Sequence, residues 1–194
     1  MTGPGSLLAV VLAAGGSSRF HDGAKQFAAI DGRPMVARVV ETVLAAGDFD
    51  AVVVVQGAVD CREVLAEFGD AITVVDNPDW RDGIATSVQV GVRVARERGA
   101  EAIVVGLADQ PGVGVDDWRA VARVEVVEPI VVARYGGRRG NPVRLERSVW
   151  HELPTTGDDG ARVVMARRPD LVSEVACSGD ASDVDTVEDL ERWN

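Results

Sequence analysis

The sequence alternates short runs of β-branched residues with longer stretches whose apolar residues recur at helical spacing. The runs rich in valine and isoleucine, which predict strands, are 7–13, 51–55, 71–75 and 102–106. Predicted helices follow the first three of them, at 33–47, 59–69 and 84–99. Strands that are apolar on both faces are typical of a parallel sheet covered by helices. The alternation therefore predicts an α/β doubly wound domain.

The last third of the chain is less regular. Strands are predicted at 129–135 and 171–176, and a helix is predicted from Asp185 to the end of the chain. The stretch GGRRGNPVRL (136–145) is expected to be a loop that leads into a short strand. Neither an internal repeat nor a linker is visible, so residues 1–194 are predicted to form a single domain.

The charge balance limits the partners. The chain has 20 basic and 31 acidic residues, for a net charge of −11. Nucleic acids and anionic membranes attract clusters of Lys and Arg, so neither is expected as a partner. No apolar run approaches the roughly 20 residues that span a bilayer, and the N-terminus lacks the pattern of a signal peptide. A cytoplasmic protein is therefore expected.

The loops that follow strands are the expected place for a ligand. In an open parallel sheet, ligands bind beyond the carboxyl ends of the strands. The loops in question are rich in Gly, Asn, Asp and Pro, and they span 13–27, 76–83, 107–114 and 135–142.

The first of these loops lies in LAAGGSSRFHDGAKQF (12–27) and contains Lys25, the only lysine among 20 basic residues. Its glycines allow turns that aim backbone N–H groups at an anion, and its side chains add hydroxyl donors and positive charge. The groups that would bind are Gly15, Gly16, Ser17, Ser18, Arg19 and Lys25. The composition favours a phosphate over a plain glycine-rich turn with a solvated lysine. The loop matches neither the Walker A motif nor the G-x-G-x-x-G pattern of dinucleotide-binding proteins.

Carboxylates in two later segments are candidate metal ligands. Asp109 follows the strand at 102–106 and faces the same sheet edge as the first loop. One carboxylate with substrate phosphates is the usual way a protein holds Mg²⁺, although a turn or helix cap would also explain Asp109. A capping box with Glu188 explains Asp185. Asp183 and Asp185 point the same way in an extended segment, so they could also approach a metal shared with Asp109.

The segment DNPDWRDGIATS (76–87) leads from a strand into a helix. Asn77 begins a turn, and Gly83 and Ser87 belong to a helix N-terminus that suits an anion or a ribose. Trp80 could form a lid over a ligand or lie in the core, and the core is the expected place for an aromatic residue.

Six segments, in their order along the chain, resemble the MobA/MocA-like nucleotidyltransferases, which attach a nucleotide to molybdopterin. They are LAAGGSSRF with its later lysine, NPDWRDGIATSV, GLADQP, GGRRGNPV, GDDGAR and DVDTVEDL. The first is shared with the wider nucleoside-diphospho-sugar transferase-like superfamily. The resemblance implies a Rossmann-like three-layer α/β/α fold with a mostly parallel sheet. It also implies a Mg²⁺-dependent reaction in which an acceptor phosphate attacks the α-phosphate of an NTP and pyrophosphate leaves.

The same resemblance implies roles for individual residues. The catalytic residues would be Arg19, on the β- and γ-phosphates, together with Lys25 and Asp109. Asp109 and Asp185 would hold Mg²⁺. The nucleotide would be bound by Leu12, Ala13, Ala14, Gly15, Gly16, Ser17, Ser18, Asn77, Gly83 and Ser87. The acceptor would be faced by Gly140, Asn141, Asp158 and Gly160.

The choice of substrates follows from the same resemblance. Leu12-Ala13-Ala14-Gly15 is similar to the cytidylyl-transferring branch, and a methyl group at Ala14 would narrow the base pocket, so CTP is favoured over GTP. The expected acceptor is a phosphorylated small molecule, namely molybdopterin or the molybdenum cofactor, with a molybdoenzyme or chaperone as a possible protein partner. Asn141 departs from the family pattern, because that branch usually has His there. The stretch before Lys25, Phe-His-Asp-Gly-Ala, also departs from it.

Two other functions stay open. Some proteins that resemble this family are labelled nicotine blue oxidoreductases, which would make the chain an NAD(P)H-dependent reductase on the same scaffold. The loops contain no hydride-transfer fingerprint, but they could bind the pyrophosphate of a dinucleotide. A non-catalytic nucleotide-binding accessory protein is the third function, and the presence of Arg19, Lys25 and Asp109 together argues against it.

Overall fold

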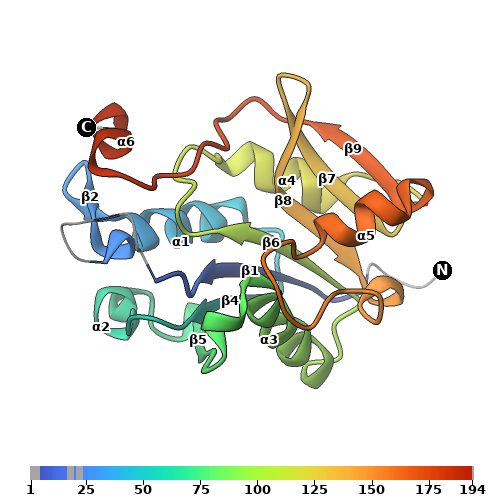
Figure 1. Ribbon diagram of the computed structural model, residues 1–194, viewed down its shortest axis with the longest axis horizontal. Helices are drawn as coiled ribbons and strands as arrows, with labels where there is room; N and C mark the ends of the chain where they lie inside the picture. The colour runs from blue at the N-terminus through green and yellow to red at the C-terminus, as the bar shows by residue number, and fades with distance from the viewer. Residues whose placement is uncertain (1–4, 17–19, 21–23, 194) are drawn as a thin grey trace.

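Seven strands form one sheet with helices on both faces (Figure 1), in a computed structural model that describes residues 5–16, 20 and 24–193. The sheet order is β5-β4-β1-β6-β8-β7-β9, and β2 and β3 form a separate pair. The strands are β1 (Leu7–Ala13), β2 (Ala29–Ile30), β3 (Arg33–Pro34), β4 (Ala51–Gln56), β5 (Ile72–Asp76), β6 (Ala102–Leu107), β7 (Ile130–Tyr135), β8 (Arg138–Glu146) and β9 (Val172–Ala176). The helices are α1 (Met35–Ala46), α2 (Arg62–Leu65), α3 (Ile84–Glu97), α4 (Val115–Arg123), α5 (Arg162–Arg167) and α6 (Val187–Leu190).

The sheet is parallel except for one strand. β1 pairs in parallel with β4 and β6, β4 with β5, and β7 with β9. Only β8 runs the other way among these strands, and it pairs antiparallel with both β6 and β7. The predicted three-layer α/β fold with a mostly parallel sheet is thus confirmed.

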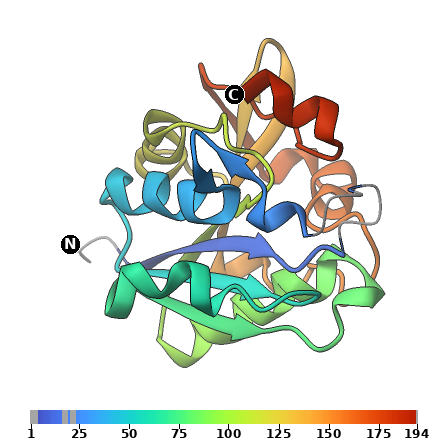
Figure 2. The ribbon, with the colours of Figure 1, turned by 90° about the vertical axis from the view of Figure 1, so that its left-hand side faces the viewer.

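Two apolar cores lie on the two faces of the sheet. Alternate residues of β1 point to opposite layers, with Val10 in the core under α3 and α5 and Val11 in the core under α1 and α4. Figure 2 shows α1 and α3 on opposite sides of the sheet. Each fully buried valine stabilises the fold by about 1.5–3 kcal/mol, so the central strands form a rigid support for the loops at their carboxyl ends.

The stretch 136–145 differs from its prediction. It is mostly strand β8, joined to β7 by a tight hairpin at Gly136 and Gly137, which both have positive φ. Two residues with positive φ are what a short hairpin turn requires, and glycine adopts that conformation without strain.

Two predicted helices are shorter than expected, and α5 was not predicted. The helix predicted at 59–69 is the single turn α2 followed by a 3₁₀ segment that is interrupted at Gly69. The last helix begins at Val187. Its N-cap is Thr186 in a capping box with Asp189, so the expected box of Asp185 and Glu188 is wrong. Within the described residues, no helix is long and apolar enough to cross a membrane.

Candidate active site

Lys25 is held beside the carboxyl end of β1 by the residue that follows it. Gln26 is buried, and its Nε2 donates hydrogen bonds to the carbonyl oxygens of Gly15 (2.6 Å) and Ala13 (3.2 Å). These bonds fix the returning end of the first loop against the end of β1. Gln26 is a supporting residue that sequence reasoning missed, because nothing local in the sequence marks its contact with Ala13 and Gly15.

Lys25 joins three segments that are distant in the sequence. Its Nζ lies 2.5 Å from Asp109 Oδ2, beyond the end of β6, and 2.9 Å from Asp185 Oδ1, before α6. Burial by itself would lower the pKa of Lys25, but the charges and hydrogen bonds of Asp109 and Asp185 outweigh it and raise this pKa above its usual value. Lys25 is therefore a fixed cation at neutral pH. The structure brings together Lys25, Asp109 and Asp185.

Asp183 extends this cluster. Gln110 Nε2 donates to Asp183 Oδ1 at 2.8 Å, and the backbone N–H of Val184 donates to the carbonyl oxygen of Asp109 at 2.8 Å. Partial burial and the negative charge of Asp109 raise the pKa of Asp183, against the lowering effect of the Gln110 bond. The negative charges of Asp109, Asp183 and Asp185 thus gather around one lysine.

One oxygen of this cluster fits a hard cation. Asp109 Oδ1 is buried and has no hydrogen-bond partner in the described part of the chain. An unsatisfied buried carboxylate oxygen is costly, and a divalent cation that prefers oxygen ligands would satisfy it. The described residues contain no group of three His, Cys, Asp or Glu side chains placed to hold a metal by themselves. The arrangement therefore suits a cation that takes one or two carboxylates and completes its shell with phosphate oxygens and water.

A cavity of about 370 Å³ adjoins this cluster, and Asp109 is part of its wall. Six residues expected to bind the nucleotide line it, namely Leu12, Ala14, Gly15, Gly16, Gly83 and Ser87. Two others do not. Ala13 is buried, and Asn77 lies behind the wall, where its Nδ2 donates to Thr86 Oγ1 (2.8 Å) and Ser87 Oγ (2.9 Å). Asn77 thus supports the first turn of α3. Ser17, Ser18 and Arg19 lie outside the described residues.

Trp80 forms part of the cavity wall, so the expectation that it lies in the core is wrong. Its ring packs under the first loop, where a methyl group at Gly16 would come within 2.8 Å of ring atom Cζ3. The guanidinium carbon of Arg81 lies 4.4 Å from the centroid of the same ring, and Arg81 also lines the cavity. A flat aromatic ring and a cation are thus placed beside the loop expected to bind phosphate.

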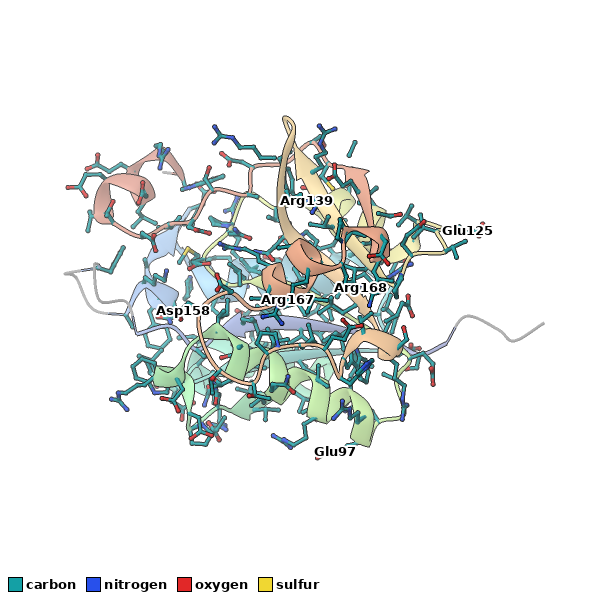
Figure 3. All side chains as sticks on the ribbon, turned by 45° about the vertical axis from the view of Figure 1, so that its right-hand side comes forward. Glu97, Glu125, Arg139, Asp158, Arg167 and Arg168 are labelled. Atoms are coloured by element: carbon teal, nitrogen blue, oxygen red, sulfur yellow. The ribbon has the colours of Figure 1, made fainter. Side chains whose placement is uncertain are left out.

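Two backbone hydrogen bonds join the loop before α5 to the chain at the first turn of α3. Gly157 N donates to the carbonyl oxygen of Asp82 at 2.7 Å, and Ala85 N donates to that of Gly157 at 3.0 Å. Gly83, with φ of 102°, permits this approach because a methyl group there would lie 2.3 Å from Gly157 C and O. Asp158, the next residue on this loop, lies in the cavity wall, and Figure 3 shows Asp158 on this loop near α3.

Replacing Gly83 by alanine is expected to lower the free energy of unfolding by about 2–5 kcal/mol, because the new methyl group would meet the Gly157 backbone in a conformation that favours glycine. Urea denaturation followed by circular dichroism measures this loss. The control is Gly99→Ala, where φ is also positive (69°) but the space is open, and the expected loss is only about 1–2 kcal/mol. Equal losses in the two variants would show that the close approach is not important.

The residues expected to face the acceptor divide between two spaces. Gly140 and Asn141 line a second cavity, of about 590 Å³, whereas Asp158 and Gly160 line a small one of about 60 Å³. Asn141 Nδ2 donates to Gln110 Oε1 at 3.2 Å, which connects the second cavity to the acidic cluster. Asn141 lines both the second cavity and the small one, and Asp158 lines both the small one and the cavity of about 370 Å³. The three spaces therefore adjoin one another in series.

Comparison with known proteins finds a family model and a curated relative that each match most of the chain. The family model described as MobA-like NTP transferase domain matches residues 9–172. The nicotine blue oxidoreductase of Paenarthrobacter nicotinovorans is 34% identical over 195 residues, which cover 94% of each chain.

Solved structures agree with the family match. Rv0371c from Mycobacterium tuberculosis H37Rv is 29% identical, with a TM-score of 0.76 over 98% of each chain. A structure of Rv0371c in complex with manganese is 27% identical, with a TM-score of 0.75 over 97% of each chain. A CMP:2-keto-3-deoxy-manno-octonic acid synthetase in complex with CTP has a TM-score of 0.76 over 96% of each chain. Its 15% identity shows a common fold alone.

Proposed function

The chain belongs to the MobA-like NTP transferase domain family, and we propose that it is a cytoplasmic, Mg²⁺-dependent nucleotidyltransferase. It moves a nucleoside monophosphate from an NTP, CTP before GTP, to a phosphorylated acceptor. The observation that carries this proposal is the cluster of Lys25, Asp109 and Asp185 beside a cavity of about 370 Å³ that glycines of the first loop line.

The proposed reaction is an in-line displacement. An oxygen of the acceptor phosphate forms a bond to the α-phosphorus, the bond from that phosphorus to the bridging oxygen breaks, and pyrophosphate leaves. Such chemistry depends on positioning and on neutralising negative charge, and it requires no nucleophilic side chain. Lys25 supplies a fixed positive charge near the reacting phosphates, and Arg19 is proposed to bind the β- and γ-phosphates.

Asp109 and Asp185 are the residues proposed to hold Mg²⁺. When bound, the cation would neutralise charge on the phosphate oxygens and orient them. The unsatisfied buried oxygen of Asp109 supports this assignment. The manganese complex of Rv0371c supports a divalent cation in a relative, and the choice of Mg²⁺ is our proposal.

The preference for CTP rests on Ala14. Ala14 lines the proposed nucleotide cavity, and its methyl group is proposed to narrow the space for the base, which would favour a pyrimidine over the larger guanine. The proposed acceptor is molybdopterin or the molybdenum cofactor, with a molybdoenzyme or its chaperone as the receiver of the product.

Pyrophosphate release tests the proposal. With Mg²⁺ and molybdopterin, we expect pyrophosphate release from CTP to be at least about ten times faster than from GTP. The reason is that steric exclusion of a base that is too large by one or two atoms is worth about 1–3 kcal/mol. The matched variant Ala14→Gly is expected to reduce this ratio by raising the GTP rate. A wild-type rate that is equal with both nucleotides, and unchanged in Ala14→Gly, would contradict the assignment of Ala14.

A second candidate is an NAD(P)H-dependent reductase, which the 34% identity to a nicotine blue oxidoreductase favours. The same cavity would then hold the pyrophosphate of the dinucleotide. The absorbance of NAD(P)H in the presence of an oxidised dye acceptor distinguishes the two candidates. Consumption of NAD(P)H without pyrophosphate release from any nucleotide would overturn the transferase proposal.

A further inference from the structure

The second cavity, of about 590 Å³, has a cationic side that the proposed chemistry does not use. Its walls are the first residues of β8, the first turn of α5 and the segment 180–183. Three arginines from two of these walls line it, namely Arg138, Arg139 and Arg162. In a chain with a net charge of −11, this gathering of arginines stands out, and those of them without an acidic partner could attract an anion.

Two of the three arginines are available to a ligand. Arg139, labelled in Figure 3, is already neutralised because its Nε lies 2.7 Å from Glu174 Oε1. Arg138 and Arg162 are exposed, and neither has an ion-pair partner among the described residues. They come from different elements, β8 and α5, and line the same cavity. The carboxylate of Asp180, which also lines the cavity, accepts a hydrogen bond from Ser182 N at 2.8 Å.

The same cavity reaches the catalytic cluster. Gln110 and Asp183 line it, and the bond from Gln110 Nε2 to Asp183 Oδ1 (2.8 Å) connects it to the group around Lys25. Its remaining surface is largely apolar, with contributions from Val132, Val143, Met165 and Ala181. A molecule that fills the cavity would thus have one end near the reacting phosphates, a carbon framework on apolar residues, and another end near Arg138 and Arg162.

We propose that the acceptor carries a second anionic group, separate from the phosphate that is modified, and that Arg138 and Arg162 bind it. This inference rests on the proposed function, since it names the chemical class of the acceptor of that same site. Guanidinium groups bind carboxylates and phosphates through paired, charge-assisted hydrogen bonds, which gives this end of the cavity its selectivity. Acceptors with a single anionic group would occupy the cavity without this contact.

A series of matched probes tests the inference by calorimetric titration in the presence of Mg²⁺. Phosphoglycolate, phosphooxypropanoate and phosphooxybutanoate each carry a phosphate and a carboxylate, and the alkyl phosphate of equal chain length is the partner of each. Three proteins are compared, namely the wild type, the double variant Arg138→Gln/Arg162→Gln, and the control variant Arg93→Gln/Arg167→Gln. The control changes the net charge equally, at exposed residues that line none of the cavities described above.

For at least one chain length, the wild type and the control variant should bind the phosphooxy acid about 10–100 times more tightly than its alkyl phosphate, and Arg138→Gln/Arg162→Gln should lose this preference. No preference at any length, or a preference that survives in the double variant or disappears in the control, would overturn the inference. CTP binding is titrated separately on all three proteins. Absence of CTP binding would count against the proposed function, whereas the probe series decides the anion site on its own.

Discussion

Replacing Lys25 by alanine is expected to slow pyrophosphate release by about a hundred- to a thousandfold. Lys25 is a mostly buried cation beside Asp109 in the wall of the proposed nucleotide cavity, and its raised pKa keeps the side chain charged at neutral pH. Removing one preorganised group that stabilises developing charge typically costs that much in rate. Steady-state pyrophosphate release with CTP, Mg²⁺ and molybdopterin measures the effect.

The same variant separates catalysis from structure. Without Lys25, Asp109 and Asp185 lose a shared counterion, so a loss of about 1–2 kcal/mol in the free energy of unfolding is expected, small beside the loss of rate. The control is Arg38→Ala, which removes an exposed ion pair with Asp31 and should leave turnover unchanged. A Lys25→Ala protein that loses much stability but turns over normally would make Lys25 a structural residue.

Replacing Asp109 by asparagine is expected to abolish the stimulation by Mg²⁺ and to reduce the rate by about a thousandfold. The substitution keeps the shape of the side chain but removes the negative charge that both Lys25 and a divalent cation require. Pyrophosphate release over a Mg²⁺ titration, together with CTP binding by calorimetry, measures the two effects.

The matched control for this variant is Asp116→Asn, which removes one acidic charge from an exposed side chain in the first turn of α4. It should leave both the rate and the Mg²⁺ dependence unchanged. A Mg²⁺ response in Asp109→Asn that equals that of the wild type would show that Asp109 is not a metal ligand.

The sequence predicts the central sheet well, and also the edge of the sheet at which the site lies, for a physical reason. The continuous valine runs of β1, β4 and β6 can be buried only between two helix layers, and the carboxyl ends of parallel strands meet at one edge. The proximity of the first loop to Asp109 follows from that geometry. Gly47 ends α1 in the left-handed conformation, in which glycine commonly ends a helix.

Other features depend on contacts that no local pattern shows. Arg138 and its glycine-rich neighbours have weak strand propensity. The strand β8 forms nevertheless, because it pairs antiparallel with β6 on one side and with β7 on the other. Asp185 has a local pattern typical of a helix cap, but Thr186 takes that position and leaves Asp185 for Lys25. The backbone hydrogen bond between Gly157 and the first turn of α3 likewise joins distant parts of the chain.

The fate of labelled phosphorus in CTP tests the central claim most directly. The protein is incubated with Mg²⁺ and molybdopterin, and in parallel with the small-molecule fraction of a cell extract as a source of acceptors. CTP labelled at the α-phosphate should pass its label to an acceptor, whereas CTP labelled at the γ-phosphate should pass its label to pyrophosphate. Transfer of the γ-label to an acceptor, or no transfer of either label while NAD(P)H is consumed, would contradict nucleotidyl transfer at the site of Lys25 and Asp109.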